Sequence, residues 1–248
     1  MFKITRAEQL TSNIYLMDVV APRVAKSCKP GQFIIVRLDE TAERIPLTIC
    51  DYDAEAGTVT IVFQPVGAST HKMTSLKAGD YFMDFVGPLG CPSEFTKEDI
   101  AELKNKKILF VAGGVGTAPV YPQVKWLHEN GVDADVIVGA KNHDLLILED
   151  EMKAVAGNLY VTTDDGSYGT KGYVSTVVDE LTKEYSFDAI YSCGAPGMLK
   201  YVDQKFENHP HAYLSMESRM ACGMGACYAC VVHLRNAKEA ALSHCCPF

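Results

Sequence analysis

Long apolar runs are missing from this 248-residue sequence, which contains no stretch of eighteen or more apolar residues. A helix needs about 20 such residues to cross a bilayer, so we expect no membrane-spanning segment. The first residues, Met1 to Arg6, also lack the apolar core that a secretory signal peptide requires. We therefore expect a soluble cytoplasmic protein that does not bind membranes.

Basic runs and basic helix faces are absent as well. The chain has 23 Lys and Arg residues against 31 Asp and Glu residues, which gives a net charge of −8 with His neutral. Proteins that bind nucleic acid need concentrated positive charge to neutralise phosphates, so this balance argues against a nucleic-acid partner. The sequence also lacks internal repeats, low-complexity tracts and coiled-coil patterns. Its length is enough for two ordinary domains and a small additional segment.

A zinc ribbon would need two separated Cys-x-x-Cys pairs, and this sequence has only one. That pair, Cys227 and Cys230, extends to Cys222 before it and Cys245 after it, with gaps of four, two and fourteen residues between successive cysteines. This is the plant-type spacing of cysteines that hold a 2Fe-2S cluster. Gly223 lets the loop turn tightly and aim backbone N–H groups at the sulfur atoms. We interpret the four cysteines as cluster ligands, with a zinc site or a disulfide pair as the alternative.

The other residues of types that bind metals show no such pattern. The seven histidines have no spacing typical of metal ligands, and we expect them to be surface or packing residues. Disulfides are rare in the cytosol, so the remaining cysteines are expected mostly to fill space in the core. These are Cys28, Cys50, Cys91, Cys193 and Cys246.

The first 90 residues have the pattern of short strands separated by turns. Turn residues such as Lys29-Pro-Gly31 and Lys77-Ala-Gly-Asp80 lie between the apolar segments. Strands this short and this closely spaced favour a small antiparallel β-barrel. The predicted strands are 14–20, 32–38, 47–50 and 58–64.

From about residue 106 the pattern changes to strands that alternate with helices. This alternation predicts a Rossmann-like parallel sheet that is covered by helices on both faces. The predicted strands are 107–112, 134–139, 159–162 and 189–192. We predict a flavin-binding barrel at 1–92, a nucleotide-binding α/β domain at 93–212 and a cluster-binding segment at 213–248.

Three loops of the α/β domain follow predicted strands. The loop with Gly113, Gly114 and Gly116 opens a helix, where free backbone N–H groups favour a pyrophosphate; a tight packing turn is the alternative. Gly194 leaves room for a flat ring beside Cys193, which could also be a small core residue. The polar loop 163–169 suits ribose hydroxyls or phosphate, or simply caps the next helix.

In the predicted barrel, Arg44 and Thr48 place a cation and a hydroxyl at the start of a strand. The segment Gly67-Ala-Ser-Thr70 opens a predicted helix whose N-terminus could bind a flavin phosphate. As alternatives, Arg44 is a solvated surface charge and Ser69 is a helix cap.

Taken together, these motifs resemble the flavoproteins of the ferredoxin-NADP reductase superfamily. More narrowly, the chain resembles the electron-transfer subunits of NAD-dependent dihydroorotate dehydrogenases of class 1B, over nearly its full length. The motifs that carry the resemblance are 87–90, 113–119, 164–169, 192–194, 196–198 and above all 215–232.

The resemblance implies FAD in the barrel, NAD in the α/β domain and a 2Fe-2S cluster that faces a partner subunit. That partner carries FMN and oxidises dihydroorotate for pyrimidine biosynthesis, in a heterotetramer with two copies of each subunit. The implied role is electron transport to NAD⁺, so no catalytic general base is expected in this chain. Matched by position, the FAD contacts are Arg44, Ile45, Pro46, Leu47, Thr48, Val62, Phe63, Gln64, Gly67, Ser69 and Thr70. The NAD contacts are Gly113, Gly114, Gly116, Thr117, Pro119, Cys193 and Gly194, and the cluster ligands are Cys222, Cys227, Cys230 and Cys245.

The chain departs from the family pattern in the flavin motif and near the C-terminus. The superfamily usually has Arg directly before the Pro of its flavin motif, whereas here Ile45 holds that place and Arg44 precedes it. In this respect the barrel is similar to the small subunit of NADH-dependent ferredoxin-NADP oxidoreductase, an electron-bifurcating transhydrogenase. That group has aspartate at the first cluster position, where this chain has Cys222. Family members usually continue past the fourth cysteine, and the adjacent Cys245 and Cys246 leave the choice of fourth ligand open.

The sequence leaves three alternatives to the dihydroorotate system. The first is the bifurcating transhydrogenase subunit, which has the same cofactors but another partner. The second is a redox-responsive regulatory module that keeps the fold without sustained turnover, and the third is a non-catalytic NAD- or zinc-binding protein.

Overall fold

The structure is a computed structural model, and it describes residues 1–216, 220–227, 229–233 and 242–244. The chain forms two compact units. The first comprises Met1–Glu8, Tyr15–Ser93 and Glu217–Phe248, and the second comprises Gln9–Ile14 and Glu94–Met216. The cysteine-rich segment therefore belongs to the same unit as the N-terminal strands. No described helix is long and apolar enough to span a bilayer.

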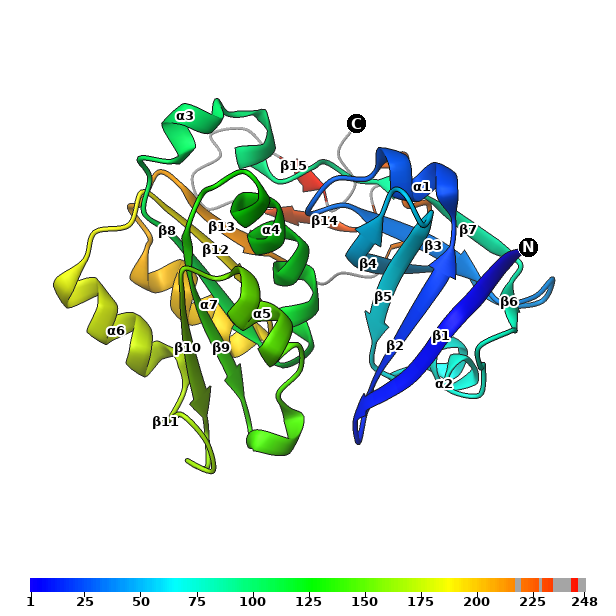
Figure 1. The fold of residues 1–248 in the computed structure, drawn as a ribbon, viewed down its shortest axis with the longest axis horizontal. Helices are drawn as coiled ribbons and strands as arrows, with labels where there is room; N and C mark the ends of the chain where they lie inside the picture. The colour runs from blue at the N-terminus through cyan, green and yellow to red at the C-terminus, as the bar shows by residue number, and fades with distance from the viewer. Residues whose placement is uncertain (217–219, 228, 234–241, 245–248) are drawn as a thin grey trace. The chain divides into compact units, whose positions relative to one another are not determined.

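The first unit is built on a seven-stranded antiparallel sheet with the order β6-β1-β2-β5-β4-β3-β7 (Figure 1). Its two edge strands, β6 and β7, follow each other in the chain with only Met83 between them, so the sheet curls into a nearly closed barrel. The elements are β1 (Phe2–Thr11), β2 (Ile14–Val20), α1 (Pro22–Ser27), β3 (Phe33–Arg37), β4 (Ile45–Asp53), β5 (Thr58–Phe63), α2 (Ala68–Met73), β6 (Tyr81–Phe82) and β7 (Asp84–Leu89).

Alternating side chains fill the interior of this barrel. On β5, Val59, Ile61 and Phe63 belong to the buried core, while the residues between them point to the other face. Ile34 and Val36 of β3 enter the same core. Burial of such side chains stabilises the fold by about 1.5–3 kcal/mol each.

The second unit contains a six-stranded parallel sheet with the order β11-β10-β9-β8-β12-β13. Parallel neighbours require crossover connections, and helices supply them except between β10 and the two-residue β11, which the loop 164–169 joins. The elements are η1 (Glu94–Lys97), α3 (Ile100–Leu103), β8 (Ile108–Gly113), η2 (Gly114–Gly116), α4 (Thr117–Glu129), β9 (Ala134–Ala140), η3 (His143–Leu145), α5 (Glu149–Val155), β10 (Asn158–Thr163), β11 (Thr170–Lys171), α6 (Val174–Glu184), β12 (Ala189–Cys193), α7 (Pro196–Lys205) and β13 (Ala212–Ser215).

Helices cover both faces of the parallel sheet, as the sequence predicts. Phe110 of β8 packs with side chains of α4 and α5 on one face, and Leu109 packs with α6 and α7 on the other (Figure 1). Because both faces are covered, β9 is buried along its whole length, Ala134–Ala140.

The structure confirms the antiparallel barrel and the parallel sheet, and it adds strands that the sequence pattern did not indicate. β1 was not predicted because most of its side chains are polar and it pairs with the two-residue β6 at one edge of the sheet. β7 includes Gly87 and Pro88, residue types that are uncommon inside strands, and it was not predicted. The predicted boundaries at 92 and 212 remain predictions.

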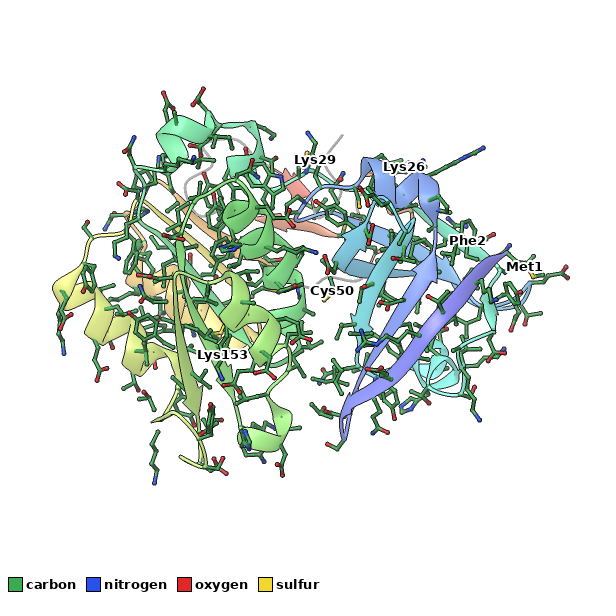
Figure 2. All side chains as sticks on the ribbon, in the orientation of Figure 1. Met1, Phe2, Lys26, Lys29, Cys50 and Lys153 are labelled. Atoms are coloured by element: carbon green, nitrogen blue, oxygen red, sulfur yellow. The ribbon has the colours of Figure 1, made fainter. Side chains whose placement is uncertain are left out.

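The cysteines outside the cluster motif differ in exposure, and this difference can be measured. Cys28 and Cys50 are buried, the latter on β4 (Figure 2), whereas Cys91 is exposed. Burial raises the pKa of the Cys28 thiol to about 11. At pH 8 only about a thousandth of Cys28 is therefore thiolate, the form that reacts with iodoacetamide. Because Cys91 is exposed and Cys28 is buried and almost wholly protonated, we expect mass spectrometry of the native protein to show Cys91 alkylated at least about 100-fold faster than Cys28. Equal rates would contradict this arrangement, and denatured protein is the control.

Candidate functional site

The first part of the candidate site is the glycine loop that follows β8 in the second unit. Gly113 ends the strand, the residues to Gly116 form the short helix η2, and α4 begins at Thr117. Gly114 has a φ of +56°, a conformation that costs other residues roughly 1–2 kcal/mol. The loop thus leads directly from a strand into a 13-residue helix, as the sequence predicts.

Close backbone contacts join this loop to the end of β12. β8 and β12 are neighbours in the sheet, with Cys193 opposite Ala112. A Cβ atom on Gly116 would lie 2.3 Å from the carbonyl oxygen of Cys193, and one on Gly194 would lie 3.1 Å from the backbone of Gly113. The structure therefore brings together the predicted NAD-contact residues of both loops, and glycine is required for this approach.

The hydroxyl of Thr117 is a buried polar group that lacks a partner. The residue is 1% exposed, and its Oγ1 has no hydrogen-bond partner. The Asn142 Oδ1 and Thr162 Oγ1 atoms, near the carboxyl ends of β9 and β10, share this property. Buried polar atoms are normally hydrogen-bonded, so three such atoms at one edge of the sheet fit a polar ligand there.

The fourth such atom among the described residues, Asp135 Oδ2, lies at the opposite edge of the sheet, where β9 begins. It has an ion-pair partner at 3.0 Å in Lys107 Nζ, so its charge is compensated without a ligand.

The side chain of Cys193 is buried in the core of the second unit. Its side chain belongs to the buried cluster that includes Phe110 and Val120, and only its carbonyl faces the glycine loop. Met198, on α7, lies over the two glycines instead: its Sδ is 2.9 Å from a Cβ built on Gly113, and its Cε is 2.8 Å from one on Gly194. Met198 was not among the predicted NAD contacts.

The polar loop after β10 is tied to the loop after β9. Asp165 accepts hydrogen bonds from the backbone N–H and the hydroxyl of Ser167, which lower the pKa of its carboxyl group. The Ser167 hydroxyl in turn accepts a bond from the His143 N–H at 2.9 Å, and the His143 ring packs on Tyr168 with centroids 4.6 Å apart. These contacts join the two loops to each other beside the carboxyl ends of β9 and β10.

The second part of the candidate site is the start of β4 in the first unit. Arg44 Nη1 lies 3.4 Å from Asp84 Oδ2, and the Ser69 hydroxyl donates to Glu43 Oε2 at 3.1 Å. The Glu43–Ser69 bond joins the segment before β4 to α2 and so brings the predicted flavin motifs together. A flavin phosphate at Arg44 and Ser69 would have to compete with these carboxylates. α2 has only six residues, so its dipole contributes little there.

The side chains of the predicted flavin motifs divide between two faces. Phe63 is buried in the barrel core, and Ile45 and Leu47 are half-buried and pack against that core. Pro46 and Thr48 alternate with them along β4 and project from the outer face.

The remaining predicted flavin contacts lie at the end of β5 and the start of α2. Thr70 Oγ1 accepts hydrogen bonds from the N–H groups of Val66 and Gly67 at 3.0 Å. A Cβ built on Gly67 would meet nothing within 4 Å, so the turn has open space beside it. Val62 and Gln64 flank Phe63, the first buried and the second half-buried.

The third part of the candidate site is the cysteine loop, also in the first unit. The Met224 N–H lies 3.4 Å from Cys222 Sγ. Hydrogen bonds from the N–H of Met224, then from the N–H and thiol of Cys227, lower the pKa of Cys222 to about 6. Gly223 and Gly225 have φ angles of +69° and +80°, which allow this turn. The loop thus favours a thiolate at Cys222, as a cluster ligand requires.

The three described cysteines of the motif divide into a pair and a single residue. The Cys222 and Cys227 thiols are in hydrogen-bond contact, while Cys230 is buried against Phe33 and Ile35. In the described part of the chain, no group of three or more His, Cys, Asp or Glu side chains could hold one metal ion. In a 2Fe-2S cluster each iron is bound by two thiolates. The pairing of Cys222 with Cys227, apart from Cys230, fits this arrangement.

Cys245 and Cys246 lie outside the described residues. The hairpin before them is described: β14 (Val231–His233) pairs antiparallel with β15 (Leu242–His244). Val231, the residue after Cys230, lies opposite His244, the residue before Cys245 in the chain.

An apolar floor beneath the cysteine loop is the part that sequence reasoning missed. It consists of Phe33 and Ile35 of β3 with Leu89 of β7. One signal was available: Phe33-Ile-Ile-Val36 is a continuous apolar run, which indicates a strand covered on both faces rather than one side of a solvated barrel.

An antiparallel barrel, a parallel sheet with a glycine loop at its carboxyl edge and a thiolate-favouring cysteine loop define the class: an iron-sulfur oxidoreductase of the ferredoxin-reductase type. Comparisons with known proteins agree. Residues 110–204 match the oxidoreductase NAD-binding domain, and residues 217–247 match the iron-sulfur cluster binding domain of dihydroorotate dehydrogenase B.

Several relatives match almost the whole chain. The electron transfer subunit of dihydroorotate dehydrogenase B (NAD(+)) from Streptococcus mutans is 46% identical, over 96% of this chain and 89% of that protein. An uncharacterized protein from Clostridium beijerinckii is 54% identical, over 94% of this chain and 79% of that protein. A solved NADH-dependent reduced ferredoxin-NADP oxidoreductase, studied for flavin-based electron bifurcation, has a TM-score of 0.83 and 35% identity, over 93% of this chain and 81% of that chain.

The chain belongs to the family of electron transfer subunits of NAD-dependent dihydroorotate dehydrogenase B. It is accordingly an oxidoreductase subunit, and the predicted family, fold class and cofactor set of FAD, 2Fe-2S cluster and NAD are confirmed. An electron transfer subunit implies a partner catalytic subunit.

Proposed function

We propose that this chain passes electrons from a dihydroorotate-oxidising, FMN-containing partner through its 2Fe-2S cluster and FAD to NAD⁺. NAD exchanges two electrons as hydride, an iron-sulfur cluster passes one at a time, and a flavin can do both. The chain's own residues bind and orient these groups, so their roles are positioning and electrostatics. The heterotetramer with two copies of each subunit and the cytoplasmic location belong to the same proposal.

The observation that carries the proposal is the cysteine loop. Cys222 is present at the first position, and three backbone N–H groups of the loop lie at its sulfur and favour the thiolate. Cys227 and Cys230 would be the next ligands. Cys245 would be the fourth, because the register of the β14–β15 hairpin places its neighbour His244 opposite the neighbour of Cys230.

The NAD site would use the glycine loop and the Thr117 hydroxyl, which has no hydrogen-bond partner. Gly113, Gly114 and Gly116 leave the α4 N-terminus open to a pyrophosphate, and Thr117 would donate or accept the hydrogen bond that it lacks in the protein alone. Pro119, Cys193 and Gly194 would complete this edge. The flavin would contact Pro46 and Thr48 by side chain, Arg44, Ser69 and Thr70 by polar groups, and Ile45, Leu47, Val62 to Gln64 and Gly67 by backbone.

A second candidate function has its own support. The solved ferredoxin-NADP oxidoreductase matches this chain at a TM-score of 0.83. A small subunit of a bifurcating transhydrogenase would use the same three cofactors with a different partner.

Anaerobic purification with the native partner separates the two functions. The sample would be assayed for iron, acid-labile sulfide and flavin identity, then mixed with dihydroorotate. We expect about two irons per chain, FAD, and an FMN-bearing partner that is reduced by dihydroorotate. A partner rich in 4Fe-4S centres that does not respond to dihydroorotate would support the transhydrogenase instead.

Thr117→Val tests the NAD site. The change keeps the shape of the side chain and removes a hydroxyl that has no partner in the ligand-free protein. We therefore expect unchanged or slightly higher stability, because an unsatisfied buried group is lost. The Kd for NADH should rise about 2- to 10-fold, the size of one lost hydrogen bond. Calorimetry of unfolding and NADH titration measure the two effects. A less stable variant with unchanged NADH affinity would show that the hydroxyl serves the fold only.

A further inference from the structure

β3 of the barrel carries apolar side chains on both faces. Ile34 and Val36 point into the barrel core, and Phe33 and Ile35 point outward. Although they lie on the outer face, Ile35 is only 3% exposed and Phe33 is also buried. An outward strand face of a small barrel is normally solvated, so something covers this one.

The cover is the cysteine loop. Cys230 is buried in the same cluster as Phe33 and Ile35, with Met220 and Leu89 packed against them. The contact at Gly223 is tight: a Cβ atom there would lie 2.2 Å from Ile35 Cδ1 and 3.3 Å from Ile35 Cγ1. The Ile35 side chain therefore touches the turn directly after Cys222.

β4, with the predicted flavin motif, is the next strand. Ile35 lies opposite Pro46, and Phe33 lies opposite Thr48. Opposed residues of an antiparallel pair project to the same face, so Pro46 and Thr48 share the outer face with the floor of the cysteine loop. Neighbouring strands are about 4.8 Å apart.

We propose that Phe33 and Ile35 are positioning residues for the iron-sulfur cluster, which they hold on the outer face of the barrel one strand away from the flavin-binding face of β4. The proposal rests on the proposed function and deepens it. The paired strands would fix the spacing of the two redox groups, and the apolar floor of Phe33 and Ile35 would keep water from the cluster on that side.

The experiment compares variants of the full chain, purified anaerobically with its native partner. Gly223→Ala should lower iron and acid-labile sulfide per FAD at least fivefold, because a φ of +69° is strained for alanine and the added Cβ meets Ile35 Cδ1. Val has no Cδ1, so the double variant Gly223→Ala with Ile35→Val should recover the share of the iron that the contact costs and should hold more iron than Gly223→Ala alone. Ile35→Val alone should keep nearly all of it.

Val86 provides the matched control. It lies opposite Ile35 on β7 and on the same face, but it is 40% exposed and does not belong to the floor. Val86→Ala should leave the iron content unchanged and should not rescue Gly223→Ala. The proposal would be overturned if Gly223→Ala lost as much iron in the Ile35→Val background as in the native one. It would also be overturned if Val86→Ala restored the iron of Gly223→Ala as well as Ile35→Val does.

A spectroscopic measurement separates positioning of the cluster from support of the fold. Ile35→Thr and Ile35→Val introduce side chains of the same shape, and only the Thr side chain places a hydroxyl under the cluster. The more polar floor should shift the midpoint potential of the cluster to a more positive value, read by EPR-monitored titration, with the FAD content equal in both. Identical potentials would contradict contact between the floor and the cluster. If the native protein holds no iron, the proposed function fails with the inference; if it holds iron but shows neither rescue nor shift, the inference alone fails.

Discussion

Cys222→Ala is expected to abolish electron transfer from dihydroorotate to NAD⁺ in the complex while NADH still reduces an artificial dye. A 2Fe-2S cluster needs four protein ligands, and this variant removes one whose sulfur is surrounded by backbone N–H donors. Loss of an outer-shell partner alone costs roughly 10- to 100-fold in metal affinity, so loss of a ligand should cost at least that. We expect iron per chain to fall below a tenth of the native value and coupled turnover to fall at least tenfold, roughly in proportion.

The dye reaction is the internal control for this variant. The glycine loop that would bind NAD lies in the second unit, and the flavin motifs lie on β4 and α2, so neither depends on the Cys222 thiol. Cys91→Ala is the matched control, because Cys91 is exposed and lies outside the four-cysteine motif. Both variants should bind FAD normally. Full coupled turnover by Cys222→Ala would show that electrons reach NAD⁺ without the cluster.

Gly116→Ala is expected to weaken NAD binding strongly. The added Cβ would lie 2.3 Å from the Cys193 carbonyl oxygen and 2.8 Å from the Gly194 Cα, and both are backbone atoms that cannot rotate away. Overpacking of this kind typically costs about 1–3 kcal/mol. For a protein of this size, that lowers the Tm by roughly 2–4 °C per kcal/mol. A displacement of about 1 Å at the nucleotide loop can reduce hydride transfer roughly 100-fold.

Gly197→Ala is the matched control for Gly116→Ala. Gly197 is the second residue of α7, near the same edge of the sheet, and a Cβ there would meet nothing within 4 Å. Alanine has the higher helix propensity, so this variant should be as stable as the native protein or slightly more stable. Scanning calorimetry and stopped-flow reduction of the flavin by NADH measure both variants. Native kinetics in Gly116→Ala would show that the two loops can separate without cost to the site.

Some features of this protein follow from local sequence. The cysteine spacing, the glycine loop that opens α4 and the switch from short strands to strand–helix alternation each depend on residues close together in the chain. Local hydrogen-bonding and steric rules are enough to interpret such patterns. For this reason the fold class, the family and the cofactor set could be predicted, whereas the polar, edge-located β1 could not.

Other features depend on contacts between distant residues. The sequence placed Ile45 to Thr48 together as flavin contacts, and the structure divides them between the barrel core and the outer face. It offered no reason to connect Met198 with Gly113 and Gly194, which the packing of α7 against the ends of β8 and β12 brings together. The ligand residues and the domain boundaries remain predictions.

The local sequence encodes the chemistry of this protein: four thiols at cluster spacing and a glycine loop before a helix. Contacts between residues far apart in the chain fix where that chemistry is held. The cysteine loop packs on the outer face of β3, about 190 residues earlier in the chain, and β3 pairs with the flavin strand. The physical reason is that a single loop cannot bury its own apolar side chains, so its position is fixed by the floor on which Cys230 and Gly223 pack.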